Sequence, residues 1–373
     1  MDSHRRRFLL DCDQRGLCPA VAAAGARPVV LVSLPGGLYD DAWVLAGEEI
    51  LREAKKGLPQ GAEVCAALPA GGFWMEPYGE LPFAQGAAHY AAAAKKAAAW
   101  GADSVLIQRA RTLLQARAGV LGAREAGLPV YVMLEITGEG EGLGGGGDIL
   151  AAFITLQELG VAALGLCSPV TGVILEALEE VAPCCRVPLM AVTRDLTGEL
   201  PVPETRALFA SRTARLAALG ADWQGILEAG APEVEAAVAA LLEEPVPAIR
   251  RVDYRGEEEI WAAGEKQVFY LDGGIEFSDP ILCQSDMADE IIQLEHQGEE
   301  AICIQPETAD DGYNISLNNA NLTMLPVVFL SDDEEALDNA LFYYNGRAMV
   351  DSRSLIPEER LEEIAGRYGA VVV

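Results

Sequence analysis

Short apolar runs alternate with longer, Ala-rich amphipathic stretches from residue 28 onward. This alternation is typical of βα units, in which each strand of a parallel sheet is followed by a helix. Counting an opening run at 8–11, about eight strand candidates lie in the first 240 or so residues, which is the size of a (β/α)8 barrel. The predicted strands cover 8–11, 28–33, 63–67, 104–108, 130–136, 163–167, 188–192 and, on a weaker pattern, 225–227.

The alternation stops at residues 243–247, Glu-Glu-Pro-Val-Pro, where two prolines prevent a helix from continuing. We therefore expect a barrel over residues 1–244, a linker over 245–251 and a second domain over 252–373. Between the barrel strands the predicted helices cover 84–100, 110–126, 149–159, 173–181, 204–219 and 232–242.

The second domain again alternates strands with helices, but its helices are acidic. Five parallel strands cannot close a barrel that needs eight, so we expect an open sheet with helices on its faces. The predicted fold class is thus α/β: a (β/α)8 TIM barrel followed by a smaller open α/β domain with a mostly parallel sheet. The exposed edges of such a sheet need to be covered, either by the barrel or by a second copy of the chain. We therefore expect a homo-oligomer. The predicted strands are 267–271, 301–305, 326–330, 347–351 and 370–373.

The chain is strongly acidic, with 27 Lys plus Arg against 57 Asp plus Glu and a net charge of −30. That charge repels phosphate backbones and anionic lipid surfaces, so neither nucleic acid nor a membrane is an expected partner. The apolar part of the amino-terminal segment is too short for a signal peptide, and no apolar run reaches membrane-spanning length. Eight dispersed cysteines do not form a disulfide framework, so the expected location is a reducing cytoplasm.

Three segments, taken in order, resemble the central strands of the homocysteine S-methyltransferase barrel. They are residues 101–108, 123–130 and 158–168, and weaker likeness extends to residues 8–11, 208–210 and 217–222. In that family a zinc ion held by three cysteines binds homocysteine as a thiolate, the species that attacks an electrophilic methyl group. The resemblance therefore implies methyl transfer to a thiol in methionine or one-carbon metabolism.

The cysteine pattern departs from that family. Cys167 occupies the place of the first zinc ligand, but Leu166 stands where the family has Asn. The other two ligands come from a Gly-Gly-Cys-Cys-Gly motif, and residues 225–232 contain no cysteine. Cys12, beside Asp11, lies at the same end of the predicted barrel as Cys167. A remodelled metal site that includes Cys12 is therefore an alternative. We therefore expect no cofactor, with zinc on Cys167 as the open alternative.

The resemblance also assigns a substrate pocket. Asp11 is retained, whereas the family's Glu-Thr pair, which helps to bind the amino acid, is replaced by Gln108-Arg109. The expected ligand is a small molecule, an amino acid or a methylated amine, and a corrinoid protein stays open as a partner. The expected substrate-binding residues are Asp11, Gln108, Glu135, Cys167 and Ser168, with Cys167 as the metal candidate.

Residues 326–352 and 368–373 resemble the first half of a pterin-binding barrel, which directly follows the homocysteine barrel in methionine synthase. Asp351-Ser352 stand where that family has an Asn-Ser pair whose Asn contacts the pterin. An Asp accepts hydrogen bonds from ring N–H groups but does not donate when ionised. The chain ends after one more predicted strand, so we expect no pterin site.

Two other interpretations stay open. The combined changes at Gln108, Leu166 and residues 225–232 favour a non-catalytic binding or assembly protein that kept the barrel. A metal-free barrel enzyme would instead use strand-end carboxylates for acid/base work, namely Glu76, Glu135 and Asp195. The glycine-rich segment 138–147 is expected to be a loop over the barrel mouth.

Overall fold

The structure, a computed structural model of the 373-residue chain, describes residues 6–34, 41–70, 74–77, 79–136, 142–194, 202–227, 229–245, 252, 259–272, 274–318 and 325–373. The chain folds into two compact units. Unit 1 comprises residues 1–73, 87–144 and 161–251, and unit 2 comprises residues 74–86, 145–160 and 252–373. Most of the predicted linker, residues 246–251, lies outside the described residues.

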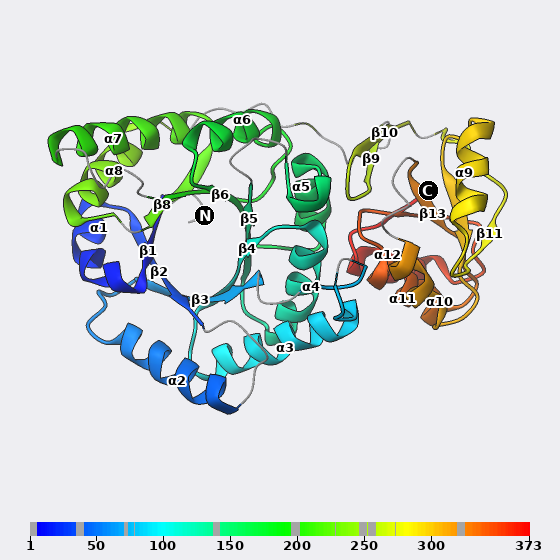
Figure 1. Cartoon of the computed structure of the whole chain (residues 1–373), viewed down its shortest axis with the longest axis horizontal. Helices are drawn as coiled ribbons and strands as arrows, with labels where there is room; N and C mark the ends of the chain where they lie inside the picture. Colours follow the sequence, from blue (N-terminus) through cyan, green and yellow to red (C-terminus); the bar gives the residue numbers. More distant parts are fainter. Residues whose placement is uncertain are drawn as a thin grey trace. The chain divides into compact units, whose positions relative to one another are not determined.

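Eight parallel strands close into a ring, and helices surround it (Figure 1). The predicted TIM barrel is confirmed. Each strand pairs with the next along the chain, and β1 pairs with β8 to close the barrel. The strands are β1 (Arg7–Asp11), β2 (Arg27–Ser33), β3 (Glu63–Pro69), β4 (Ser104–Ala110), β5 (Val130–Glu135), β6 (Ala163–Ser168), β7 (Leu189–Arg194) and β8 (Ala221–Leu227).

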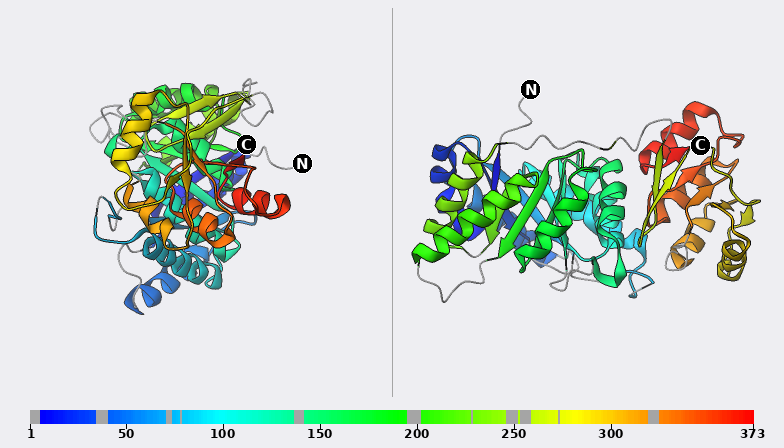
Figure 2. Two further views of the ribbon diagram at one scale, coloured as in Figure 1. Left: turned by 90° about the vertical axis from the view of Figure 1, so that its right-hand side faces the viewer. Right: turned by 90° about the horizontal axis from the view of Figure 1, so that it is seen from above.

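The helices of unit 1 lie outside the ring and run alongside the strands, as the side view shows (Figure 2). They are α1 (Cys18–Ala24), α2 (Asp41–Lys55), most of α3 (Phe83–Ala99), α4 (Leu113–Ala123), α6 (Thr171–Val181), α7 (Val202–Ala218) and α8 (Ala231–Glu243). Helix α5 (Ile149–Glu158) follows β5 in sequence and belongs to unit 2. Short 3-10 turns are η1 (Cys12–Leu17), η3 (Arg124–Ala126) and η4 (Gly144–Gly146).

The ring interior is filled by alternate side chains of the strands. Leu9, Leu106 and Met133 belong to one buried cluster there, together with Cys65 and Cys167. Because successive side chains of a strand point to opposite faces, residues two positions further along share this interior face. This alternation identifies which residues at the carboxyl ends of the strands face the interior.

Unit 2 contains a five-stranded parallel sheet in the order β11-β12-β13-β14-β15. Its strands are β11 (Ile281–Leu282), β12 (Ile302–Gln305), β13 (Val327–Phe329), β14 (Met349–Val350) and β15 (Val371–Val372). Its helices are α9 (Ala288–Gln297), α10 (Asp311–Asn318), α11 (Glu334–Tyr343) and α12 (Glu358–Arg367). The predicted open, parallel sheet is confirmed.

Two details of the predicted sheet are wrong. Residues 267–271 do not join it: β10 (Val268–Leu271) pairs antiparallel with β9 (Ile260–Ala263). The first sheet strand is instead the two-residue β11. Phe269 and Leu271 of this hairpin pack against Val328 and Met349 on one face of the sheet.

Unit 2 includes elements from the first half of the chain. The ring of Phe83 lies 5.2 Å from that of Phe342 in an edge-to-face contact, and the backbone N–H of Asp148 donates to the carbonyl of Glu265 across 3.0 Å. Residues 74–86 and helix α5 are therefore part of the packing of unit 2. Within the described residues, no helix is both long and apolar enough to cross a membrane.

Candidate functional site

Three of the predicted substrate-binding side chains share the interior face at the carboxyl end of the barrel. Gln108 lies two residues beyond Leu106 on β4, Glu135 two beyond Met133 on β5, and Cys167 is itself in the interior cluster. Glu135 pairs in register with Cys167 on the neighbouring strand. Active sites of TIM barrels lie at this end of the strands, so this interior face is the candidate site.

Glu135 is bonded by two arginines that follow β4. The Nε of Arg109 donates to Oε1 of Glu135 across 2.9 Å, and a terminal nitrogen of Arg109 donates to the same oxygen. The Nε of Arg111 donates to Oε2 across 2.7 Å. Both carboxylate oxygens of Glu135 are thus engaged, and each guanidinium gives a charge-assisted hydrogen bond.

The backbone is distorted to make this arrangement. Arg109 has φ 58°, a left-handed backbone conformation that residues other than Gly, Asn and Asp rarely adopt. The register between β4 and β5 shifts between Ile107 and Ala110. Such a bulge changes the direction of side chains at the rim of a barrel, and here it brings Arg109 to Glu135.

The two arginines also set the ionisation of Glu135. Burial alone would raise the pKa of its carboxyl, but the hydrogen bonds from Arg111 and Arg109 outweigh burial and lower the pKa below its usual range. Glu135 is therefore a carboxylate at neutral pH and a weak base. The acid/base role considered for it from the sequence is disfavoured by this environment.

Gln108 and Ser33 meet at the ends of β4 and β2. The hydroxyl of Ser33 donates to Oε1 of Gln108 across 3.3 Å. Asp11 lies at the end of β1, and its backbone N–H donates to the side chain of Gln14 across 3.0 Å. The amide of buried Gln14 in turn donates to the carbonyls of Ile226 and Ala229, and so ties the first strand to the last.

Ser168, at the end of β6, has a local role. Its hydroxyl accepts from the backbone N–H of Val170 across 3.2 Å, which stabilises the turn into α6. Adjacent along β6, Cys167 is 7 % exposed and lies among apolar side chains of the interior, including Val192 and Leu227. Cys167 therefore belongs to the barrel interior, and Ser168 to the loop that follows.

The described residues at this end of the barrel do not supply the three cysteines that hold zinc in the family. Of the side chains that the structure describes, no group of three or more His, Cys, Asp or Glu is placed to hold a metal. At the end of β8, Leu227 and Ala229 are buried and apolar, and neither is a metal ligand. Cys12 begins η1, and burial raises the pKa of its thiol, which opposes the thiolate form that zinc requires.

The other carboxylates considered from the sequence are Asp195 and Glu76. Asp195 lies outside the described residues, as do residues 137–141 of the glycine-rich segment. Glu76 belongs to unit 2, where the Tyr313 hydroxyl lies 3.4 Å from its Oε2. The described part of the glycine-rich segment, residues 142–147, includes the 3-10 turn η4.

In unit 2, Asp351 and Ser352 follow β14 at the carboxyl edge of the sheet. Asp351 is 1 % exposed and accepts two hydrogen bonds from the guanidinium of Arg353 at its Oδ2, at 2.9 and 2.6 Å. The backbone N–H of Ser352 donates to the carbonyl of Val373 across 2.9 Å. A pterin would have to displace Arg353 to reach the Asp351 carboxylate.

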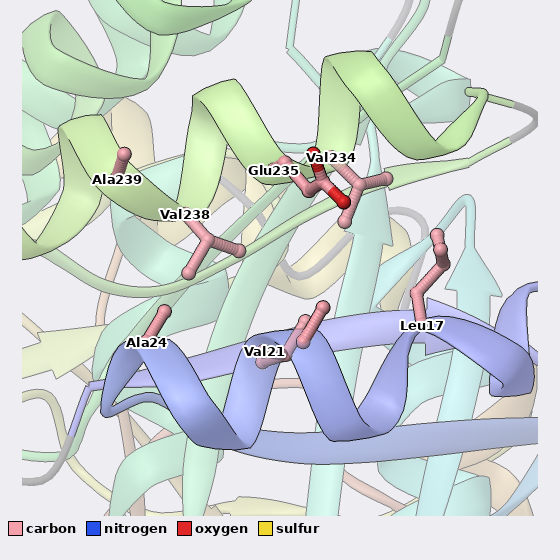
Figure 3. Close-up of a pocket in the computed structure, with 8 residues that line it drawn as sticks. Leu17, Val21, Ala24, Val234, Glu235, Val238 and Ala239 are labelled. Carbon is pink, nitrogen blue, oxygen red and sulfur yellow. The ribbon is translucent and has the colours of Figure 1, made fainter.

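An apolar pocket lies between α1 and α8, in the helix layer outside the ring of strands (Figure 3). None of the residues predicted for the site lines it. Its only charged lining side chain is Glu235. It is lined by Leu17, Ala20, Val21, Ala24, Val234, Glu235, Val238 and Ala239.

Sequence reasoning missed the contact of Arg109 and Arg111 with Glu135. The signal was present: two arginines, two positions apart, follow one predicted strand, and a glutamate ends the next. The backbone distortion at Arg109 that joins them has no signature in the sequence pattern.

Comparison with known proteins gives one family match. The model of the family described as homocysteine S-methyltransferase matches residues 38–226. That span is about half of the 373-residue chain and contains Gln108, Glu135 and Cys167, whereas Asp11 precedes it. No curated protein matches the chain by sequence.

The comparison with solved structures also gave matches. The metallated form of the homocysteine methyltransferase MmuM from Escherichia coli is 16% identical, with a TM-score of 0.49, and the match covers 63% of this chain and 96% of that one. The apo form of MmuM is 17% identical, with a TM-score of 0.46, covering 61% and 84%. The protein CitE from Mycobacterium tuberculosis, solved with magnesium, acetoacetate and coenzyme A, is 16% identical with a TM-score of 0.38, covering 73% and 94%.

Proposed function

The chain belongs to the homocysteine S-methyltransferase family, and from that premise we propose that it transfers a methyl group to the sulfur of a small thiol bound at the carboxyl end of the barrel. The observation that carries the proposal is the placement of Gln108, Glu135 and Cys167. These side chains share the interior face of three adjacent strands, inside the segment that matches the family.

In this proposal the thiol loses its proton to solvent water, and the sulfur electron pair then forms the new S–CH3 bond. The bond between the methyl group and the donor breaks, and its electrons leave with the donor. Arg109 and Arg111 are the cations nearest to Glu135 in the described residues, and positive charge near a thiol lowers its pKa. Cys167 lines the interior beside Glu135 and contributes to the shape of the binding site.

The proposal includes no zinc ion. It is supported by the donor set: one family cysteine, Cys167, is present, while residues 225–232 contain no cysteine. Elemental analysis of the purified full-length chain is expected to give far less than one zinc per chain, unchanged in Cys167→Ser. Stoichiometric zinc that disappears in Cys167→Ser would overturn this part of the proposal.

The activity itself is tested by incubating the protein with homocysteine and methyl donors of two classes, sulfonium compounds and methylated amines. The expected product is the S-methylated thiol, with a rate reduced by Gln108→Ala, which alters the interior surface of the site. The absence of product with every donor, from protein with an intact barrel, would contradict the proposal.

A second function, binding without catalysis, has its own support. Gln108, Leu166 and residues 225–232 differ together from the residues that the family uses for chemistry. Calorimetric binding of homocysteine or methionine without turnover would favour this second function. A homo-oligomeric state and a corrinoid partner stay predictions, which sedimentation and copurification experiments test. A location in the cytoplasm is a further prediction, which cell fractionation tests.

A further inference from the structure

Arg111 has more donor atoms than Glu135 uses. Its Nε bonds Oε2 of Glu135, and across the part of the chain that the structure describes its two terminal nitrogens have no protein partner. The side chain is 52% exposed, whereas that of Glu135 is 17% exposed. A guanidinium carries five N–H donors in a planar fork, so one edge of Arg111 is available to a ligand at the end of β4.

Several positive groups lie together at this position. The guanidiniums of Arg109 and Arg111 both bond the carboxylate of Glu135. Arg111 also directly precedes Thr112, the N-cap of α4, and the amino end of a helix is itself positive. The free edge of Arg111 therefore faces its ligand from a position beside a second guanidinium and a helix amino end, and both favour an anion.

The position of Arg111 is fixed before any ligand arrives. Its backbone N–H donates to the side chain of buried Gln115 across 3.0 Å, and its carbonyl accepts from the backbone N–H of Gly144 across 2.7 Å. Beside it, Arg109 is held in a left-handed backbone conformation, with φ 58°, that is strained for a residue with a side chain. Strained backbone of this kind persists mainly at binding and catalytic sites.

From these observations we infer that Arg109 and Arg111 form an anion subsite, in which the terminal nitrogens of Arg111 bind a carboxylate of the substrate. That the carboxylate belongs to a thiol rests on the proposed function. Within the described contacts of this subsite, the carboxylate of Glu135 is already bonded to both arginines, and Gln108 is neutral. The subsite therefore selects a mercapto-acid, or an amino-acid thiol bound through its carboxylate.

Two small thiols of opposite charge test the inference by calorimetry on the full-length protein under reducing conditions. At pH 7, 3-mercaptopropionate carries a carboxylate and cysteamine carries an ammonium group. We expect 3-mercaptopropionate to bind and cysteamine not to bind. Inorganic phosphate is the third probe, because a guanidinium fork also binds phosphate oxygens.

Variants then locate the site. Arg111→Gln is expected to weaken the binding of 3-mercaptopropionate at least tenfold. Arg111→Lys, which keeps the charge but loses the planar fork of donors, is expected to weaken that binding less. Arg52→Gln is the matched control, since Arg52 is an exposed arginine on α2 and the net charge changes equally. The control is expected to leave the affinity unchanged, and circular dichroism checks that each variant is folded.

Several outcomes would overturn the inference: preferential binding of cysteamine, binding of phosphate but not of the mercapto-acid, no binding of any probe, or equal affinity in folded Arg111→Gln. The methyl-transfer assay separates the two hypotheses. Arg111-dependent binding without methyl transfer keeps the subsite and rejects the proposed function. Methyl transfer that is indifferent to Arg111→Gln keeps the function and rejects the subsite.

Discussion

The hydroxyl of Tyr131 donates to Oε1 of Glu63 across 2.6 Å, inside the barrel at the amino ends of β5 and β3. Ser104 donates to the same oxygen at 2.7 Å, and Arg7 to the other at 2.6 Å. Burial, together with the negative charge of Glu63, raises the pKa of Tyr131 and keeps its hydroxyl protonated as a donor. The barrel interior thus has an ionic network at its amino end, separate from the arginines at its carboxyl end.

This network makes Glu63 important for stability. In Glu63→Gln the charge that balances Arg7 is lost in a buried setting, since Glu63 is 3% exposed. Breaking a buried pair costs about 3–5 kcal/mol, so we expect a decrease of that order in the free energy of unfolding, measured in urea. Glu125→Gln removes an exposed pair with Lys95 and should change stability by less than about 1 kcal/mol. Equal effects of the two changes would contradict the prediction.

Glu135 should contribute a pH-dependent part of the stability. Its folded pKa is lowered, so its stabilising effect is complete above the unfolded value of about 4.3 and is lost as the pH falls through the folded pKa. Glu135→Gln should therefore be less stable than the native chain by about 1 kcal/mol at pH 7, with a smaller difference below pH 4. Urea unfolding at both pH values measures this, with Glu48→Gln on α2 as the control. If the stability difference between Glu135→Gln and the native chain grew as the pH fell, the prediction would be wrong.

Most of the barrel could be predicted from the sequence because its strands are buried on both faces and therefore apolar. The predicted strands at 104–108 and 130–136 correspond to β4 and β5. The last strand was predicted only from residue 225, whereas β8 begins at Ala221. Its first half contains Asp222 and Gln224, and Gln224 is buried through a hydrogen bond to the Thr213 carbonyl that no sequence pattern reveals.

The small sheet was harder to predict because its strands are short. β11 has two residues, and its Leu282 is 46% exposed, so it gives no apolar run. The apolar segment at 267–271 is a hairpin strand packed on the sheet face, and composition does not distinguish that role from a parallel strand. At the candidate site, the residue types were visible in the sequence, but the pairing of Arg109 with Glu135 depends on a local left-handed residue.

Two glycines in helices should respond oppositely to alanine. A Cβ on Gly122 would lie 2.1 Å from the Ala87 carbonyl oxygen, because α4 packs there against the backbone of α3. A Cβ on Gly172 would meet nothing within 4 Å. Alanine favours a helix by about 1 kcal/mol over glycine, so Gly172→Ala should raise the melting temperature by a few degrees, while overpacking makes Gly122→Ala destabilising by about 1–3 kcal/mol. Thermal unfolding followed by circular dichroism measures both, and a stable Gly122→Ala would show that the two helices separate easily.

The final strand, β15, covers one edge of β14. β15 is half-buried, and its described pairing is with β14 alone. Deleting residues 369–373 would remove the carbonyl of Gly369 that accepts from Arg347, and would turn the fully buried strand β14 into an edge. An exposed apolar edge strand pairs with other chains, so we expect the truncated protein to sediment as aggregates. Leu355→Ser, which alters an 81% exposed side chain of the same unit, should leave sedimentation unchanged. A truncated chain that sediments like the native protein would show that β15 does not protect β14.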